Sequence, residues 1–145
     1  MPSLADLVRL GRIEEVAADV EAARGLLDHA TTHLESARTI VAADCAGAYQ
    51  LAYDAARKAV TADVSANGYR VKSDRPGAHA AVVAYADEAL VHDVSPDALR
   101  DLDRMRRTRN RSEYGGITVG RRQAEEDLDL AAEIVEAVKR RVPGS

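Results

Sequence analysis

The chain has 145 residues and a formal net charge of −4. This length fits one domain, and a chain of this size buries enough surface to form a core of its own. Because Phe and Trp are absent, we expect a core built from Ala, Val, Leu and Ile. The sequence predicts a single domain over residues 1–145, with residues 1–20 as an N-terminal helical extension.

The cellular setting follows from what the sequence lacks. Cys45 is the single cysteine and cannot form an intrachain disulfide, which is typical of a reducing cytoplasm. No apolar stretch approaches the roughly 18 residues of a membrane span, and the first residues do not resemble a signal peptide. We expect a cytoplasmic protein with no membrane contact and no cofactor. The excess of arginine over lysine, with abundant Ala and Val, indicates a GC-rich bacterial genome.

Apolar residues recur at helical spacing along most of the chain, beginning near the N-terminus. Ser3 and Asp6 have the spacing of a capping box, which predicts a short first helix. The helical pattern then resumes at Ile13. Gly25 is expected to interrupt it before a helix over residues 26–43.

The later helices have start and stop signals of their own. Asp44 is a suitable N-cap for a helix that ends at Asn67-Gly68. A polar loop over residues 70–76 precedes a helix over residues 77–92. The apolar stripe expected on the helix after Asp44 comprises Tyr49, Ala52, Tyr53, Ala56, Val60 and Val64.

Two helices complete the chain. Ser95 and Pro96 provide an N-cap and a first-turn proline for a helix expected to stop near Gly115. The last helix is expected over residues 119–142. Because the connections are short, the sequence predicts an all-α, up-and-down antiparallel bundle of about five to six helices.

The most basic stretch is residues 104–111, where five of eight residues are arginine. Arg109 continues the apolar stripe of Leu102 and Met105, so we expect it to face other helices. Arg104, Arg107 and Arg111 fall on another face and are expected to be ordinary surface. A solvated helix end is the plain alternative for the cluster. Pairing with an acidic stretch is another, its members being Glu125, Glu126, Asp127, Asp129 and Glu133.

Three segments together resemble the HEPN superfamily, in particular its small actinobacterial members. They are residues 26–37 (LLDHATTHLESA), residues 47–59 (GAYQLAYDAARKA) with the following Asn67-Gly68, and residues 106–115 (RRTRNRSEYG). The likeness covers roughly residues 20–142. It implies a helical bundle associated with RNA or nucleotides. Many members are metal-independent ribonucleases of toxin–antitoxin or phage-defence systems, and others are inert partners of a nucleotidyltransferase.

The catalytic signature of that family is an arginine, four to six residues, and then a histidine. Arg109-Asn110 matches its beginning, but Tyr114 follows after four intervening residues, and no histidine occurs after His92. A histidine with a pKa of about 6.5 exchanges protons near pH 7, whereas a tyrosine of about 10 is a poor base there. We therefore expect weak or no ribonuclease activity.

Two main interpretations of function remain open, beside a weaker third one: an adaptor with no nucleic-acid role, whose arginines pair internally with the acidic stretch. The first is an RNA- or nucleotide-associated binding or regulatory module of a toxin–antitoxin or phage-defence system. The second is a metal-independent ribonuclease toxin that cleaves RNA by 2′-hydroxyl attack, with Arg109, Asn110 and Tyr114 as its catalytic residues. In either case the residues expected to bind RNA or another anion are Arg106, Arg107, Arg109, Asn110 and Arg111.

Partners are expected on two grounds. A small aliphatic core leaves limited apolar area per chain, which favours a homodimer. The family resemblance implies the same state, with two motif segments facing each other across a two-fold axis. It also implies a nucleotidyltransferase or another antitoxin as a possible protein partner, in addition to RNA.

Other polar residues are better explained as structural. His29 and His33 lie four apart and could share a helix face, but a convincing third zinc ligand is missing, so we expect no metal. His79 follows the polar loop and is interpreted as a helix-end residue rather than a catalytic one. Cys45 has no neighbouring histidine that would make it a nucleophile.

Overall fold

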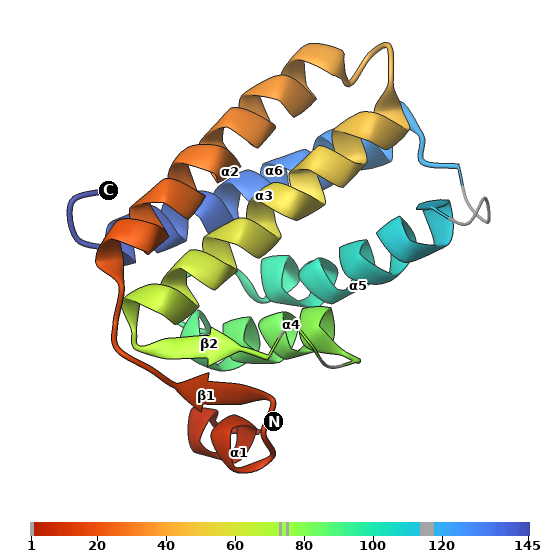
Figure 1. Cartoon of the computed structure of the whole chain (residues 1–145). Helices are drawn as coiled ribbons and strands as arrows, with labels where there is room; N and C mark the ends of the chain where they lie inside the picture. Colours follow the sequence, from red (N-terminus) through yellow and green to blue (C-terminus); the bar gives the residue numbers. More distant parts are fainter. Residues whose placement is uncertain (1, 73, 75, 114–117) are drawn as a thin grey trace.

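A computed structural model of the chain describes residues 2–72, 74, 76–113 and 118–145 (Figure 1). Within these residues the fold is an all-α bundle with one small sheet, which confirms the fold class expected from the sequence. None of the described helices has the length and apolar character needed to span a bilayer. The elements are α1 (Leu4–Arg9), β1 (Ile13–Glu15), α2 (Val20–Ile40), α3 (Cys45–Ala66), β2 (Tyr69–Val71), α4 (Ala78–Ala89), α5 (Pro96–Glu113) and α6 (Arg121–Arg141).

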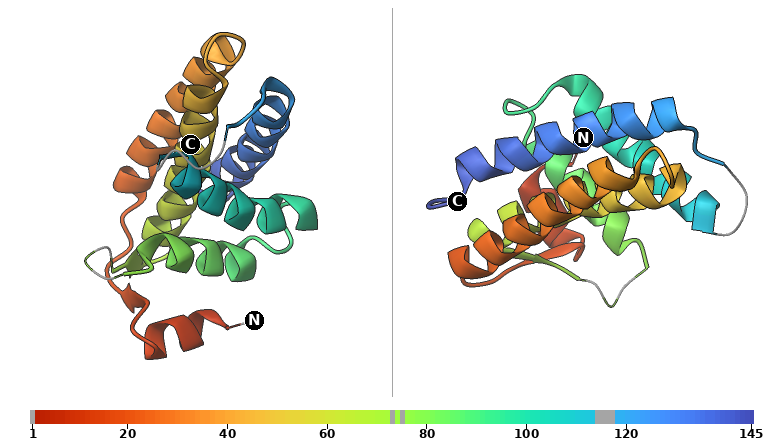
Figure 2. Two further views of the ribbon diagram at one scale, coloured as in Figure 1. Left: turned by 90° about the vertical axis from the view of Figure 1, so that its right-hand side faces the viewer. Right: turned by 90° about the horizontal axis from the view of Figure 1, so that it is seen from above.

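Three long helices form the main body of the bundle. α2 and α3 make an antiparallel hairpin, and α6 packs along both of them (Figures 1 and 2). The shorter α4 packs on α3 and α5, and α5 also packs on α6. Alternating spacings of four and three residues give α2 a continuous seam, as in helices that pack side by side. The buried residues of that seam are Ala23, Leu27, Ala30, Leu34 and Ala37.

Tyrosines supply much of the core volume. Tyr49, Tyr53 and Tyr85 are each about 1% exposed and are among the largest fully buried side chains. They replace the missing Phe and Trp as wide apolar bodies between the alanine-rich helices. The expectation of a purely aliphatic core was therefore incomplete, although the apolar stripe containing Tyr49 and Tyr53 is confirmed.

A two-stranded sheet corrects the expectation that the helical pattern resumes at Ile13. β1 pairs antiparallel with β2, and Ile13 lies opposite Val71. Ile13 is only 1% exposed, so its burial favours the strand in which it faces the core. The loop predicted over residues 70–76 likewise begins with strand residues. The partner strand is distant in sequence, which is why local periodicity missed the pairing.

The predicted break at Gly25 is also wrong, because α2 runs through it without interruption. A glycine inside a helix costs about 1 kcal/mol relative to alanine. Ala23 and Leu27 are both buried against the bundle, and this burial exceeds that cost. Nothing lies within 4 Å of where a side chain at Gly25 would begin, so packing does not require a glycine.

The predicted caps at other helix starts are confirmed. Ser3 and Asp6 form the reciprocal bonds of a capping box at α1. Asp44 accepts a hydrogen bond of 2.9 Å from the backbone N–H of Gly47 at the start of α3. Ser95 Oγ accepts one of 3.2 Å from the N–H of Ala98 at the start of α5. The expected stop at Gly115 lies outside the described residues.

A buried carboxylate ties the C-terminal end of α6 to α3 and α4. Asp63 is fully buried, and Arg141 donates to its two oxygens over 2.6 Å and 3.1 Å. The Tyr85 hydroxyl donates to the same carboxylate over 2.8 Å, and Asn67 adds a further bond of 3.1 Å. Because the buried charge has several donors, this network fixes how the three helices meet.

Candidate functional site

A group of polar side chains gathers where α3, α4 and α5 meet. Tyr53, Asp54 and Arg57 come from α3, His79 from the first turn of α4, and Arg109 from α5. We call these five residues the α3–α4–α5 cluster. α4 and α5 lie beside one another along α3, so residues far apart in sequence become neighbours (Figure 1).

Helical spacing on α3 places three members of the cluster together. Tyr53 and Arg57 are four residues apart and therefore lie on one face of the helix. Asp54 and Arg57 are three apart, and their Oδ1 and Nε atoms are 3.6 Å from each other. The Tyr53 ring is buried, whereas Asp54 and Arg57 are about three-quarters buried, with 27% and 28% of their side chains exposed.

Arg109 reaches α3 from α5, as its position on the apolar stripe predicts. Its Nη2 lies 3.9 Å from Oδ1 of Asp54, and its guanidinium carbon is 5.7 Å from the centre of the Tyr53 ring. An arginine at this distance from a tyrosine face makes a favourable cation–π contact. Only 19% of its side chain is exposed, which makes Arg109 the least exposed arginine of the basic stretch.

His79 lies beside Tyr53, with 3.4 Å between its Nδ1 and the tyrosine hydroxyl. Partial burial lowers the pKa of His79 below its ordinary value, and the positive charges of Arg57 and Arg109 lower it further. Burial also raises the pKa of Tyr53 to about 12. At neutral pH the pair therefore consists of an uncharged imidazole and a protonated hydroxyl, and the tautomer of the imidazole decides which of the two donates.

Two other arginines of the basic stretch form ion pairs within α5 itself. Arg106 and Arg107 both pair with Asp103, one turn earlier in α5, at 3.0 Å and 3.3 Å. Arg111 is exposed and Asn110 is half-buried. The fold thus presents Arg107 and Arg111 to solvent on the helix that carries Arg109. Tyr114, the residue at the histidine position of the signature, lies outside the described residues.

Arg104 corrects the expectation that this residue is ordinary surface. It donates two hydrogen bonds to the carboxylate of Asp127 on α6, over 2.6 Å and 3.1 Å. Asp127 is only 1% exposed, and Gln123 donates to it as well. The same pair partly supports the alternative that the arginines are matched by the acidic stretch. Arg104 therefore has a structural role in joining α5 to α6.

The rest of the acidic stretch is engaged in several different places. Glu125 and Glu126 pair with arginines one turn earlier in α6, and Asp129 lies 3.5 Å from Arg38 of α2. Glu133 accepts hydrogen bonds from the backbone and side chain of Ser95. These contacts explain the stretch as helix-surface pairing and as support for the start of α5.

The paired histidines of α2 have a structural neighbour of their own. His33 Nε2 lies 2.7 Å from Nζ of Lys58, and partial burial lowers the pKa of this histidine. An ammonium group at that distance competes with any cation for the ring nitrogen. Among the described residues, no three His, Cys, Asp or Glu side chains are close enough together to hold a metal ion.

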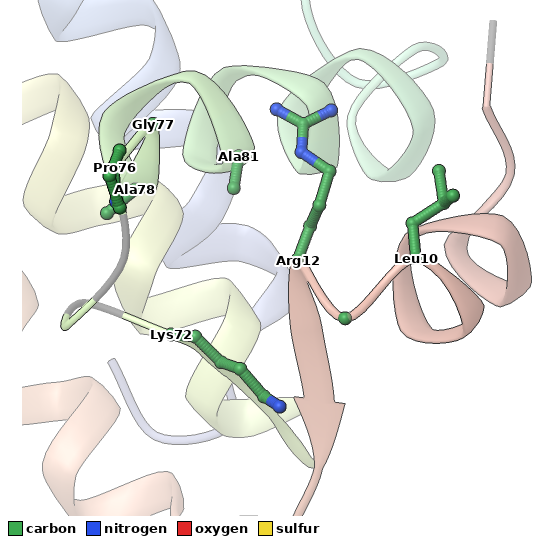
Figure 3. A pocket seen from close by; sticks show the side chains of 8 residues that line it. Leu10, Arg12, Lys72, Pro76, Gly77, Ala78 and Ala81 are labelled. Carbon is green, nitrogen blue, oxygen red and sulfur yellow. The ribbon is translucent and has the colours of Figure 1, made fainter.

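A small hollow lies between the start of α4 and the segment that joins α1 to β1. Its volume is about 200 Å³, and it is bordered by Arg12 and Lys72. Figure 3 shows Arg12 extending from the start of β1 towards α4, with Lys72 following β2. Leu10 and Ala81 also border this hollow, and Leu10 is largely exposed. It holds none of the side chains of the α3–α4–α5 cluster.

The fold is an all-α module. Its helix α5 places basic side chains near the point where α3, α4 and α5 meet. Comparison with known protein families matches the HEPN domain over residues 20–141. The chain therefore belongs to the HEPN family, a class of modules related to nucleotides and RNA. Comparisons with curated proteins and with solved structures gave no significant match.

The cluster contains residues that the sequence did not single out as a site. No sequence motif points to Arg57 as a site residue, and the position of His79 after the polar loop predicts a helix-end residue. The four-residue spacing of Tyr53 and Arg57 is a signal in the sequence that these two residues share a helix face. The approach of His79 to Tyr53 was not detectable, because it depends on how α4 packs on α3.

Proposed function

We propose that this HEPN domain is a binding or regulatory module that engages RNA or a nucleotide through the arginines of α5. The position of Arg109, held between Tyr53 and Asp54, is the observation that carries this proposal. A guanidinium that is fixed by its surroundings loses little conformational entropy when it binds phosphate in its planar fork. We further propose a toxin–antitoxin or phage-defence setting, on the basis of the resemblance to small family members.

The exposed arginines would contribute in a different way. Arg107 and Arg111 lie at the surface, where they attract a polyanion without fixing its position. Binding to several phosphates releases counterions, so the affinity should fall steeply as salt rises. Arg109 should determine affinity at one phosphate, whereas the surface arginines should set the salt dependence.

Titration of single-stranded RNA at low and moderate salt tests this proposal. Arg109→Ala should weaken binding about tenfold, the value of one charge-assisted phosphate contact. Arg109→Lys keeps the charge and should retain part of the affinity. Arg122→Ala is the matched control, because Arg122 is 93% exposed on α6, where it pairs with Glu126 one turn later. Equal affinities for wild type and Arg109→Ala, or no binding at low salt, would contradict the proposal.

Ribonuclease activity is a second candidate, favoured by one observation: His79 lies in the same cluster as Arg109. Cleavage by 2′-hydroxyl attack needs a base that removes the hydroxyl proton as oxygen bonds to phosphorus. It also needs an acid that protonates the departing 5′-oxygen. In the tautomer in which Nδ1–H donates to the Tyr53 oxygen, an uncharged His79 keeps the lone pair of Nε2 free and has the chemistry of such a base, and Arg109 has the charge to stabilise the crowded phosphate.

We also propose a homodimer and, in the toxin–antitoxin setting, a nucleotidyltransferase or another antitoxin as the protein partner. The support is membership of a family in which dimers are common, and a two-fold dimer is the most frequent state of soluble homo-oligomers. A two-fold axis would place two copies of α5 near one substrate and double the number of arginines that face it.

A further inference from the structure

A cavity of about 710 Å³ lies between α3, α4, β2 and the segment that joins β1 to α2. Its volume falls in the range of small-molecule sites. Arg57 and His79 border it, so this cavity and the α3–α4–α5 cluster share two side chains. The cavity lies on the β2 side of these residues, while the α5 arginines lie on the other side of the cluster and do not border it.

The walls of the cavity are mostly apolar. Val64 comes from α3, Val71 from β2, Val82 from α4 and Leu26 from α2. Val64 and Val82 also belong to the buried core, so this wall is held in place by the bundle itself. A wall of this kind suits an aromatic or aliphatic body, because burial of such a body removes apolar surface from water.

One end of the cavity is lined by the cationic side chain of Arg57 and by His79. The Nε atom of Arg57 is buried and makes no hydrogen bond with any described residue, since its nearest carboxylate oxygen, on Asp54, is 3.6 Å away. His79 lies against Tyr53 on the same side. A buried guanidinium donor without a hydrogen-bond acceptor is the position where an anionic ligand gains most.

The start of α4 adds to this end. Ala78 and His79, the first residues of this twelve-residue helix, both border the cavity. The N-cap, Gly77, has a φ of 85°, and no side chain caps the first turn. The free N–H groups of a first helical turn, and the positive end of the helix dipole, attract negatively charged groups.

The opposite end of the cavity offers no such donor. Asp19 accepts a hydrogen bond of 3.0 Å from the N–H of Ala22 as the N-cap of α2, and its negative charge repels an anion. Arg70 is engaged by Glu14 across the sheet, with 2.6 Å between Nε and Oε1. The unsatisfied donor of Arg57 at one end, and the carboxylate of Asp19 at the other, therefore favour an anionic group at the Arg57 end.

We propose that this cavity binds a small organic anion, with its phosphate or carboxylate group at Arg57, His79 and the start of α4. Its apolar body would lie along Val64, Val71 and Val82. This site shares Arg57 and His79 with the α3–α4–α5 cluster but none of the arginines of α5, so binding of the anion and binding of RNA by α5 can each fail without the other. A mononucleotide fits the chemistry, with its phosphate at the cationic end and its base along the apolar wall.

Binding measurements with matched pairs of compounds test the proposal. Phenyl phosphate and phenol differ only in the anionic group, and AMP and adenosine form a second pair, while benzoate distinguishes a carboxylate from a phosphate. If the site takes an organic phosphate, we expect phenyl phosphate to bind at least about tenfold more tightly than phenol, and AMP at least about tenfold more tightly than adenosine. Binding by benzoate alone would assign a carboxylate ligand, and binding by the phosphates alone would assign an organic phosphate.

Variants locate the site. Arg57→Gln should weaken phenyl phosphate binding at least about tenfold, and Arg12→Gln, at the small hollow, should not change it. Thr61→Leu narrows the cavity from α3 while keeping the helix, so it should weaken phenyl phosphate binding and leave RNA binding by α5 unchanged. Thermal unfolding of each variant shows that it is folded. Three outcomes would overturn the proposal. They are equal binding of phenol and phenyl phosphate, unchanged binding of phenyl phosphate by folded Arg57→Gln and Thr61→Leu, and no binding of any anion at millimolar concentration.

Discussion

Arg104 of α5 and Asp127 of α6 form a two-bond ion pair, with N–O distances of 2.6 Å and 3.1 Å. The carboxylate is 1% exposed, whereas 36% of the arginine side chain reaches solvent. The bonds to Asp127 raise the pKa of Arg104, so the arginine stays charged throughout the physiological range. The pair thus holds the basic helix in place through a residue that belongs to the basic stretch itself.

Arg104→Ala should lower the free energy of unfolding by about 3 kcal/mol, because it leaves a buried carboxylate without its main partner. Adding Asp127→Asn to that variant removes the stranded charge and should recover part of the loss. Urea denaturation measures both. Arg100→Ala is the control: Arg100 is 70% exposed and should change stability by less than about 1 kcal/mol. Similar losses for Arg100→Ala and Arg104→Ala would contradict this role.

The pH dependence of stability should carry a contribution from His79. Its pKa is lowered in the folded state, mainly by burial, so protonation favours the unfolded chain, where a histidine titrates near 6.5. The contribution to stability is therefore complete above about pH 6.5 and is lost as the pH falls below that value. His79→Gln should reduce the loss of stability between pH 7.5 and 5.5.

Denaturation curves at the two pH values measure this effect. His92→Gln provides the matched control, since it makes the same replacement at an exposed histidine in the segment after α4. His33, whose pKa is also lowered by burial, should behave like His79. An unchanged pH dependence in His79→Gln would show that this imidazole is not held in its uncharged form.

Ribonuclease assays on total RNA with EDTA present distinguish the two proposed functions. Wild type should show weak or no cleavage. Tyr114→His should add proton-transfer capacity near pH 7, which is worth roughly a hundred- to ten-thousand-fold in general acid–base catalysis. The products to look for are 2′,3′-cyclic phosphate ends.

Robust metal-independent cleavage by wild type would instead favour the ribonuclease. Loss of that activity in His79→Gln, with His92→Gln unaffected, would then assign the proton transfer to the α3–α4–α5 cluster. Loss in Tyr114→Phe would assign it to the signature position. The two outcomes separate a base supplied by the neighbouring helix from one supplied by the motif.

Light scattering at micromolar concentration should give a dimer, with twice the 15.6 kDa mass of the chain. The reason is that soluble homo-oligomers are most often two-fold dimers, which is the state proposed above for this domain. Moderate salt should be present, so that nucleic acid bound to the arginines does not add to the mass. A monomer under these conditions would exclude a site composed of two copies.

The sequence by itself determined the parts of this protein that depend on neighbours along the chain. The N-caps Asp44 and Ser95 bond to N–H groups three residues away, and the inward direction of Arg109 follows from helical spacing. Only the tertiary structure decided the rest. Ile13 is a strand residue because it pairs with Val71, and His79 meets Tyr53 because α4 packs on α3. Such contacts depend on the burial of apolar faces by segments distant in sequence, and this burial outweighs local preferences of the backbone.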